Sequence, residues 1–183
     1  MSVILSTQND LLLNTLLIYY DKEQNMSRMV DIINGDANIS LRIIDWFVTN
    51  YAKKNFTIYK LSSNKRFKVY SDYKLKLKSY SKRRFDPFCR WDRITVPYKN
   101  GTDVQTTLGQ LNFFKWAFEN EIIEYIEKNY QQIELDMNSR NSTAKKKMDI
   151  DDTNKTRKRR EELSVSATKT VKRDIIDITV EFE

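Results

Sequence analysis

The first third of the chain contains three segments whose apolar residues recur at the spacing of an amphipathic helix. These segments cover residues 10–20, 27–33 and 41–53. Thr7 or Asn9 can cap the first helix and Ser40 the third, because their side-chain oxygens accept hydrogen bonds from free backbone N–H groups. Gly35 follows the second segment and favours a helix end there, since glycine readily adopts a left-handed conformation. We interpret all three as helices that build a core, and we assign them no chemistry.

Two pairs of β-rich segments predict hairpins. The first pair is 56–61 with 66–70, and the second is 93–98 with 103–106. Asn100-Gly101 lies between the second pair and strongly favours a tight hairpin turn. A further strand is predicted at 175–182, where apolar and polar residues alternate. This strand either returns to the body or pairs with another chain at a sheet edge.

The segment from Asp72 to Arg84 fits two secondary structures. Strict alternation of Tyr73, Leu75 and Leu77 with lysines is a strand pattern, whereas helical spacing groups Tyr73, Leu77 and Tyr80 on one face. Ser71 as a cap and Asp72 in the first turn favour the helix. Both interpretations end before Pro87, which cannot continue a helix.

The second half of the chain begins with a predicted long helix and continues into a polar tail. Thr107 and Gln110 have the spacing of a capping box, and the apolar residues that follow predict a helix up to about Met137. Residues 138–162 contain almost no apolar side chains, so we expect a disordered basic linker. The prediction is an α+β protein in which helices pack with short hairpins. Its parts are a compact domain (1–137), the linker (138–162) and a C-terminal strand segment (163–183).

Composition removes several classes of function. The chain has 183 residues, no histidine and a single cysteine, Cys89. Without histidine there is no Ser-His or Cys-His pair for nucleophilic catalysis, and the commonest general base is missing. One cysteine cannot form an intrachain disulfide or a Cys/His zinc site. The apolar run 11–20 is too short to cross a bilayer. We therefore expect a soluble, intracellular, non-enzymatic protein with no cofactor, metal or membrane partner.

Positive charge is concentrated in the middle of the sequence. The net charge of the chain is +7, but residues 56–100 carry thirteen cations against three anions, and residues 101–137 carry two cations against seven anions. Such asymmetry indicates a polyanion on one face. The alternative is that the acidic helix packs beside the basic segment and neutralises it inside the fold.

Residues 66–93 interleave cations with aromatic rings and form the first candidate site. Cations can contact phosphates, and rings can stack on bases. The alternative is that most of the rings are core and the lysines a solvated face. The candidate nucleic-acid-binding residues are Lys74, Lys78, Tyr80, Lys82, Arg83, Arg84, Arg90, Trp91 and Arg93.

Two short basic clusters in the tail form a second, weaker candidate. Residues 145–147 and 155–160 have the arrangement of a bipartite nuclear-targeting signal, and equally of a basic arm for nucleic acid. Aspartates between the two clusters reduce the local positive field.

Four stretches together resemble a known family. They are ISLRIIDWFVTNYAKKN (39–55), YKLKLKSYSKRRFDPFCR (73–90), TTLGQLNFFKWAFENEIIEYIE (106–127) and RKRREELSVSATKTVKR (157–173). The chain resembles short, largely uncharacterised proteins of nucleocytoplasmic large DNA viruses, of the mimivirus and phycodnavirus kind. Trp91 departs from that pattern, in which a second basic residue follows the Cys-Arg pair more often. The resemblance implies replication or assembly in the host cytoplasm and packaging in a virion, and it supplies no catalytic residue.

These observations lead to two expectations for function. The first is a basic viral protein that binds nucleic acid in the virion core or virus factory. The second is a minor capsid or internal virion scaffold protein, whose strand at 175–182 would contact other virion proteins.

Overall fold

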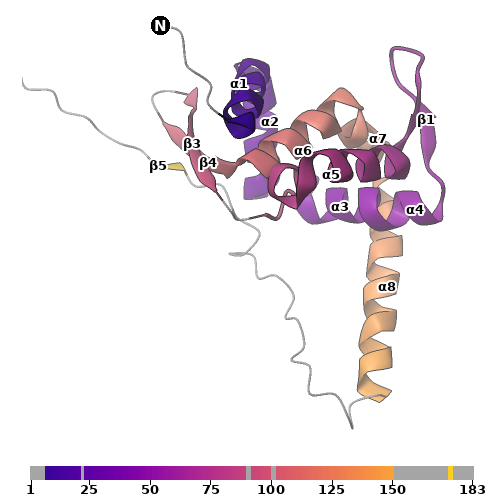
Figure 1. The fold of residues 1–183 in the computed structure, drawn as a ribbon. Coiled ribbons are helices and arrows are strands. Elements are labelled where there is room, and N and C mark those ends of the chain that lie inside the picture. Colours follow the sequence, from indigo (N-terminus) through magenta and orange to yellow (C-terminus); the bar gives the residue numbers. More distant parts are fainter. Residues whose placement is uncertain (1–6, 22, 90–91, 100–101, 151–172, 175–183) are drawn as a thin grey trace, which may run out of the picture.

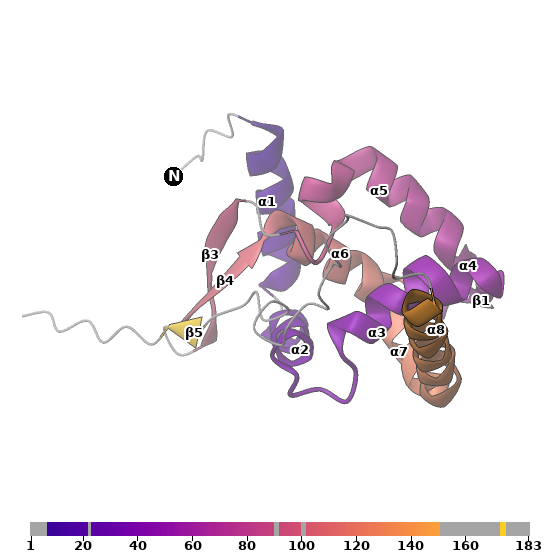
Figure 2. The ribbon, with the colours of Figure 1, turned by 90° about the horizontal axis from the view of Figure 1, so that it is seen from below.

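The computed structural model describes residues 7–21, 23–89, 92–99, 102–150 and 173–174 (Figure 1). Helices make up most of it, and the strands form one two-stranded and one three-stranded sheet. The architecture is therefore α+β, as the sequence predicts. The two hairpins lie at opposite ends of the helical body, with β1 at one end and β3 and β4 at the other (Figures 1 and 2).

The first helix begins at its predicted cap and the second ends at its predicted glycine, although the second begins at Glu23, four residues before the predicted start. Helix α1 (Gln8–Tyr20) starts after Thr7, whose hydroxyl accepts a hydrogen bond from the Asp10 N–H at 3.3 Å, while the Asp10 carboxylate accepts one from the Thr7 N–H at 3.0 Å. Helix α2 (Glu23–Asn34) ends at Gly35, which has a φ of 84°. Of the two caps that the sequence allows for α1, the structure uses Thr7.

The third predicted helix forms in three consecutive parts. Ser40 caps α3 (Leu41–Trp46), which continues into the π-helix η1 (Phe47–Tyr51) and then into α4 (Ala52–Lys54). A π-helical turn widens the helix locally and is often found at functional sites. The sequence pattern gave no indication of this turn.

Both predicted hairpins are present. Strand β1 (Ile58–Lys60) pairs antiparallel with β2 (Arg66–Lys68), and β3 (Arg93–Pro97) pairs antiparallel with β4 (Asp103–Thr107). A short strand, β5 (Arg173–Asp174), pairs with the other edge of β4. The predicted strand at 175–182 lies outside the described residues.

The ambiguous segment is a helix, α5 (Val69–Phe85). The predicted cap is wrong, because α5 begins two residues before Ser71, and Lys68, which stands at the cap position, makes no side-chain capping bond. The helix is kinked at Ser81, whose φ of 65° and ψ of 167° are non-helical. This region is strongly disfavoured for residues other than glycine, so the surrounding contacts must hold Ser81 there.

The sequence predicts one long helix after Thr107. That prediction is wrong, because the segment forms three helices. These are α6 (Leu108–Glu119), α7 (Ile122–Lys128) and α8 (Tyr130–Ile150). Asn120 and Asn129 follow the first two helices, and each side-chain amide donates to a carbonyl of the preceding turn at 2.8 Å. The asparagine side chain competes with the helix for backbone hydrogen bonds in this way and ends it.

The predicted linker at 138–162 is helical in its first half. Helix α8 continues through 138–150, and residues 151–162 lie outside the described residues. The division of the chain into domain, linker and strand segment stays a prediction.

Helix α6 is the centre of the core. Every residue from Leu108 to Phe118 except Lys115 is buried, as expected of a helix that is covered on all sides. Rings from α5 and β2 surround it: Trp116 lies 5.5 Å from Phe85, 5.9 Å from Tyr73 and 6.2 Å from Phe67, measured between ring centroids. Most of the aromatic rings in the basic segment are thus packed in or against the core.

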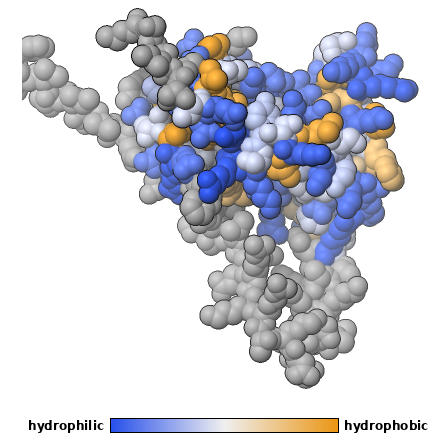
Figure 3. All heavy atoms as spheres, in the orientation of Figure 1, coloured by the Kyte–Doolittle hydropathy of each residue, from blue (hydrophilic) through white to orange (hydrophobic). Residues whose placement is uncertain are grey.

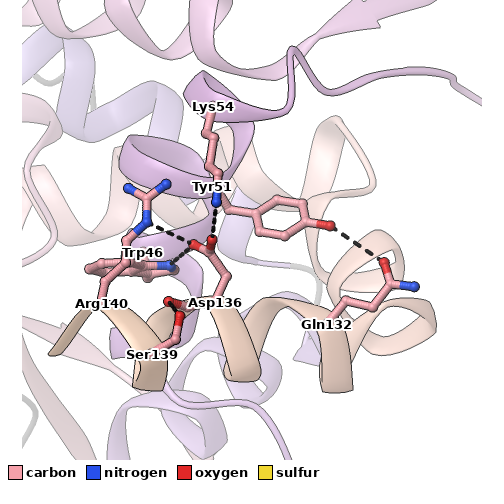
Figure 4. A network of polar contacts seen from close by, with 7 residues as sticks. All are labelled: Trp46, Tyr51, Lys54, Gln132, Asp136, Ser139 and Arg140. Carbon is pink, nitrogen blue, oxygen red and sulfur yellow. Dashed lines mark hydrogen bonds and ion pairs between the residues drawn. The ribbon is translucent and has the colours of Figure 1, made fainter. Parts of the chain in front are cut away.

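Helix α8 is attached to the body through Asp136 (Figure 4). The Asp136 carboxylate accepts from the Trp46 indole N–H at 3.1 Å and from the Lys54 ammonium at 3.1 Å, and it pairs with Arg140 at 3.5 Å. These donors keep the pKa of Asp136 below its ordinary value despite the opposing effect of desolvation. One carboxylate therefore joins α8 to the α3–α4 segment.

Gly109 allows the closest approach between α6 and the turn after α5. A Cβ atom added there would lie 2.7 Å from the Asp86 carbonyl oxygen and 3.1 Å from that of Arg83. We predict that Gly109→Ala lowers the free energy of unfolding by about 1–3 kcal/mol, because backbone must move to make room. Urea unfolding measures this. Glu119→Ala, at an exposed position of the same helix, is the control and should change stability by less than about 0.5 kcal/mol. Equal effects of the two changes would contradict the prediction.

Candidate nucleic-acid interface

Three lysines at every fourth residue follow the outer surface of α5. Lys74, Lys78 and Lys82 are all exposed, and no carboxylate in the described part of the chain pairs with them. We call them the α5 lysine row. Figure 3 shows the face of the molecule that carries α5, where hydrophilic residues predominate. The row is a set of fixed positive charges directed to solvent.

Packing against α6 decides which face of α5 is exposed. Val69, Tyr73 and Phe85 are buried, whereas the three lysines of the row are exposed. Asp72, one of the few acidic residues of the basic segment, accepts a hydrogen bond from the Trp116 indole N–H at 2.6 Å. Asp86 accepts from the Phe88 backbone N–H at 2.9 Å in the turn that ends the helix. Both carboxylates thus bind neutral N–H groups and form no ion pair with the row.

The cluster Lys82-Arg83-Arg84 lies after the kink at Ser81. Lys82 and Arg83 are exposed, whereas Arg84 is half-buried. The Arg84 guanidinium donates to the Gln8 side chain at 3.2 Å, and its carbonyl accepts from the Asn112 amide at 2.9 Å. Arg84 therefore fastens α5 to its neighbours, whereas the side chains of Lys82 and Arg83 are exposed.

The other predicted site residues are not all brought to this surface. Tyr80 is half-buried and stacks on Phe85, with 6.0 Å between ring centroids and an interplanar angle of 18°. Arg93 is exposed, but it belongs to β3 in the second hairpin and not to the helical row. Arg90 and Trp91 lie outside the described residues, so their roles stay predictions.

The acidic helices pair with cations from other elements. Glu124 on α7 binds Arg28 of α2 at 2.7 Å, and Asp136 on α8 binds Lys54 of α4. Figure 2 shows α5 on one side of α3 and α4, with α7 and α8 on the other. The arrangement therefore favours an outward basic surface over the alternative of neutralisation by the acidic helices.

A pocket beside the lysine row brings in residues that the sequence analysis missed. It has a volume of about 340 Å³ and lies between η1 and α5. Its lining comprises Thr49, Tyr70, Tyr73, Lys74, Leu77, Lys82 and Asp86. Helical spacing relates Tyr70, Lys74 and Leu77, but nothing in the sequence indicates that Thr49 packs beside them.

Asp45 of α3 is half-buried near this pocket. Burial, together with the nearby charge of Asp86, raises the pKa of its carboxyl to about 6. The described residues contain no cluster of three or more acidic or cysteine side chains that could hold a metal ion. The site therefore offers positive charge, aromatic surface and hydrogen-bonding groups.

Comparison with known proteins identifies the family. A family model described as "Family of unknown function (DUF7197)" matches residues 4–180, and the chain belongs to that family. The chain is 45% identical over 127 residues to "Uncharacterized protein L507" of Acanthamoeba polyphaga mimivirus, an alignment that covers 65% of this chain and 49% of the relative. The chain thus spans about half the length of that relative. These matches support the resemblance to an uncharacterised family of giant-virus proteins.

Neither solved structures nor membrane segments extend this picture. No solved structure matches the chain. Within the described residues, no helix has the length and hydrophobicity needed to cross a bilayer.

The raised pKa of Asp45 predicts a pH-dependent stability. Its pKa in the folded state is about 6, against an ordinary value of 3.8, so the unfolded chain loses its proton first as the pH rises. The contribution of Asp45 to the free energy of unfolding therefore falls between about pH 4 and pH 6. Asp45→Asn stays neutral and should be more stable than the native protein by roughly 1–2 kcal/mol at pH 7, a value reduced for partial exposure. Urea unfolding at pH 4 and pH 7 tests this, and a stability difference that is the same at both pH values would contradict it.

Proposed function

We propose that this protein is a non-enzymatic nucleic-acid-binding protein of a giant virus, acting in the virion core or virus factory. Lys74 and Lys78 of the α5 lysine row contact phosphates before the kink at Ser81, and Lys82 and Arg83 extend that contact past it. Arg90 and Arg93 complete the predicted set of cations, and Tyr80 or Trp91 supplies stacking.

The observation that carries the proposal is the lysine row itself. All three lysines are exposed and keep their charge unpaired, although Asp72 and Asp86 belong to the same segment. Binding a polyanion there would release its condensed counterions, which makes affinity strongly dependent on salt. The viral setting rests on the mimivirus relative.

The proposal predicts a specific loss of salt dependence. The triple variant Lys74→Gln/Lys78→Gln/Lys82→Gln removes the row but keeps the aliphatic stems. We expect the slope of log affinity against log salt on duplex DNA to decrease in magnitude by about 2 to 3, because each phosphate contact contributes about 0.9. Fluorescence anisotropy titrations at salt concentrations from about 50 to about 200 mM give this slope.

A charge-matched variant separates the row from net charge. Arg28→Gln/Lys54→Gln/Lys128→Gln removes the same number of charges, two of them from exposed cations that pair with acidic residues. This control should bind nearly as the native protein does. An equal loss in both triple variants would refute a localised site, and native protein that does not bind duplex or single-stranded DNA at low salt would refute the proposed function.

A further inference from the structure

The pocket between η1 and α5 has the groups needed to hold a base as well as a phosphate. Lys74 and Lys82 belong both to the lysine row and to the pocket lining. Its volume of about 340 Å³ falls within the range of roughly 300–1,000 Å³ that is typical of small-ligand sites. A ligand that contacts the row therefore has direct access to the pocket.

The walls of the pocket differ in chemistry. Tyr70 is half-buried and Leu77 partly exposed, and together they provide aromatic and apolar surface against which a planar ring can lie. The ammonium of Lys53 lies 5.7 Å from the centre of the Tyr70 ring, so that ring is already close to a cation. This surface suits the face of a base, and the neighbouring lysines suit the phosphates on either side of it.

Polar groups face the same space. One oxygen of Asp86 accepts from Phe88, and no described residue bonds to the other, which remains able to accept from a base N–H. The Thr49 hydroxyl donates to the Asp45 carbonyl at 2.6 Å and accepts from the Asn50 amide at 2.8 Å. These bonds orient the hydroxyl at the wall formed by the π-helical turn. The pocket thus combines a stacking surface with at least one hydrogen-bond acceptor.

We infer that this pocket binds one unpaired nucleotide of a single-stranded nucleic acid, with its base against Tyr70 and Leu77 and its adjoining phosphates on Lys74 and Lys82. A base within a duplex is stacked on both sides and paired at its edge, so it enters such a pocket only after extrusion from the helix. The inference rests on the proposed function and specifies its ligand as single-stranded.

Strands that differ only in their bases test the inference. The probes are a 12-nucleotide DNA strand, the same strand with three central abasic sites, and the corresponding duplex. The abasic strand keeps every phosphate but offers no base to the pocket. We expect the native protein to bind the intact strand at least about 5-fold more tightly than the abasic strand, given the usual contribution of one stacked base.

Two pocket variants locate the effect. Tyr70→Ala and Leu77→Ala should reduce the preference for the intact over the abasic strand to less than about 2-fold, while affinity for the abasic strand and its salt dependence remain. Tyr130→Ala, which removes a half-buried tyrosine from α8, is the matched control and should retain the preference. Circular dichroism checks that each variant is folded. The two pocket substitutions are made in separate proteins, so each tests the pocket by itself.

The outcomes distinguish this inference from the proposed function. Equal, salt-dependent affinity of the native protein for the intact and abasic strands would overturn the pocket inference and leave phosphate binding by the row intact. A mononucleotide that competes at the same concentration as the strand would overturn it in favour of a small-nucleotide site. Loss of affinity for both strands in Tyr70→Ala and Leu77→Ala would overturn the assignment of a base-specific role to these side chains. Absence of binding to any of the three probes would refute both proposals.

Discussion

The close contact between Gly109 and the turn at Asp86 is the constraint on which the position of α5 depends. Because no side chain separates the two backbones, the end of α5 lies directly on α6, the helix that is buried on nearly all sides. The rings of Tyr73, Phe85 and Trp116 then fill the space along the two helices. This packing leaves the lysine row exposed to solvent. The candidate interface is thus a consequence of the packing of the core.

Local signals in the sequence predicted much of the fold. Thr7, Ser40 and Gly35 mark helix boundaries through short-range hydrogen bonding or backbone freedom, and they do so here. The hairpins likewise follow from turn residues between β-rich segments. Helical spacing predicts that Lys74 and Lys78 lie on one face, whereas the kink at Ser81, after which Lys82 lies, could not be predicted from that spacing.

Features that depend on distant contacts could not be read in the same way. Glu121 adopts a φ of 54° between α6 and α7, and its carboxylate accepts from the Ser62 N–H of the hairpin loop, which a periodicity argument cannot anticipate. The pocket needs η1 to lie beside α5, and the segments are about twenty residues apart. The structural use of Asp72 and Asp86 was also hidden, since a carboxylate among lysines suggests an ion pair before it suggests an indole or a turn.

The unpaired charges of α5 have an energetic cost. Like charges four residues apart on a helix repel, so Lys74, Lys78 and Lys82 each oppose the folding of the segment that displays them. An isolated helix of this composition would be weakened by its own charge, and here the aromatic packing on α6 offsets that repulsion. The packing of Tyr73 and Phe85 against Trp116 thus has to offset an electrostatic cost that arises at the surface of the same helix.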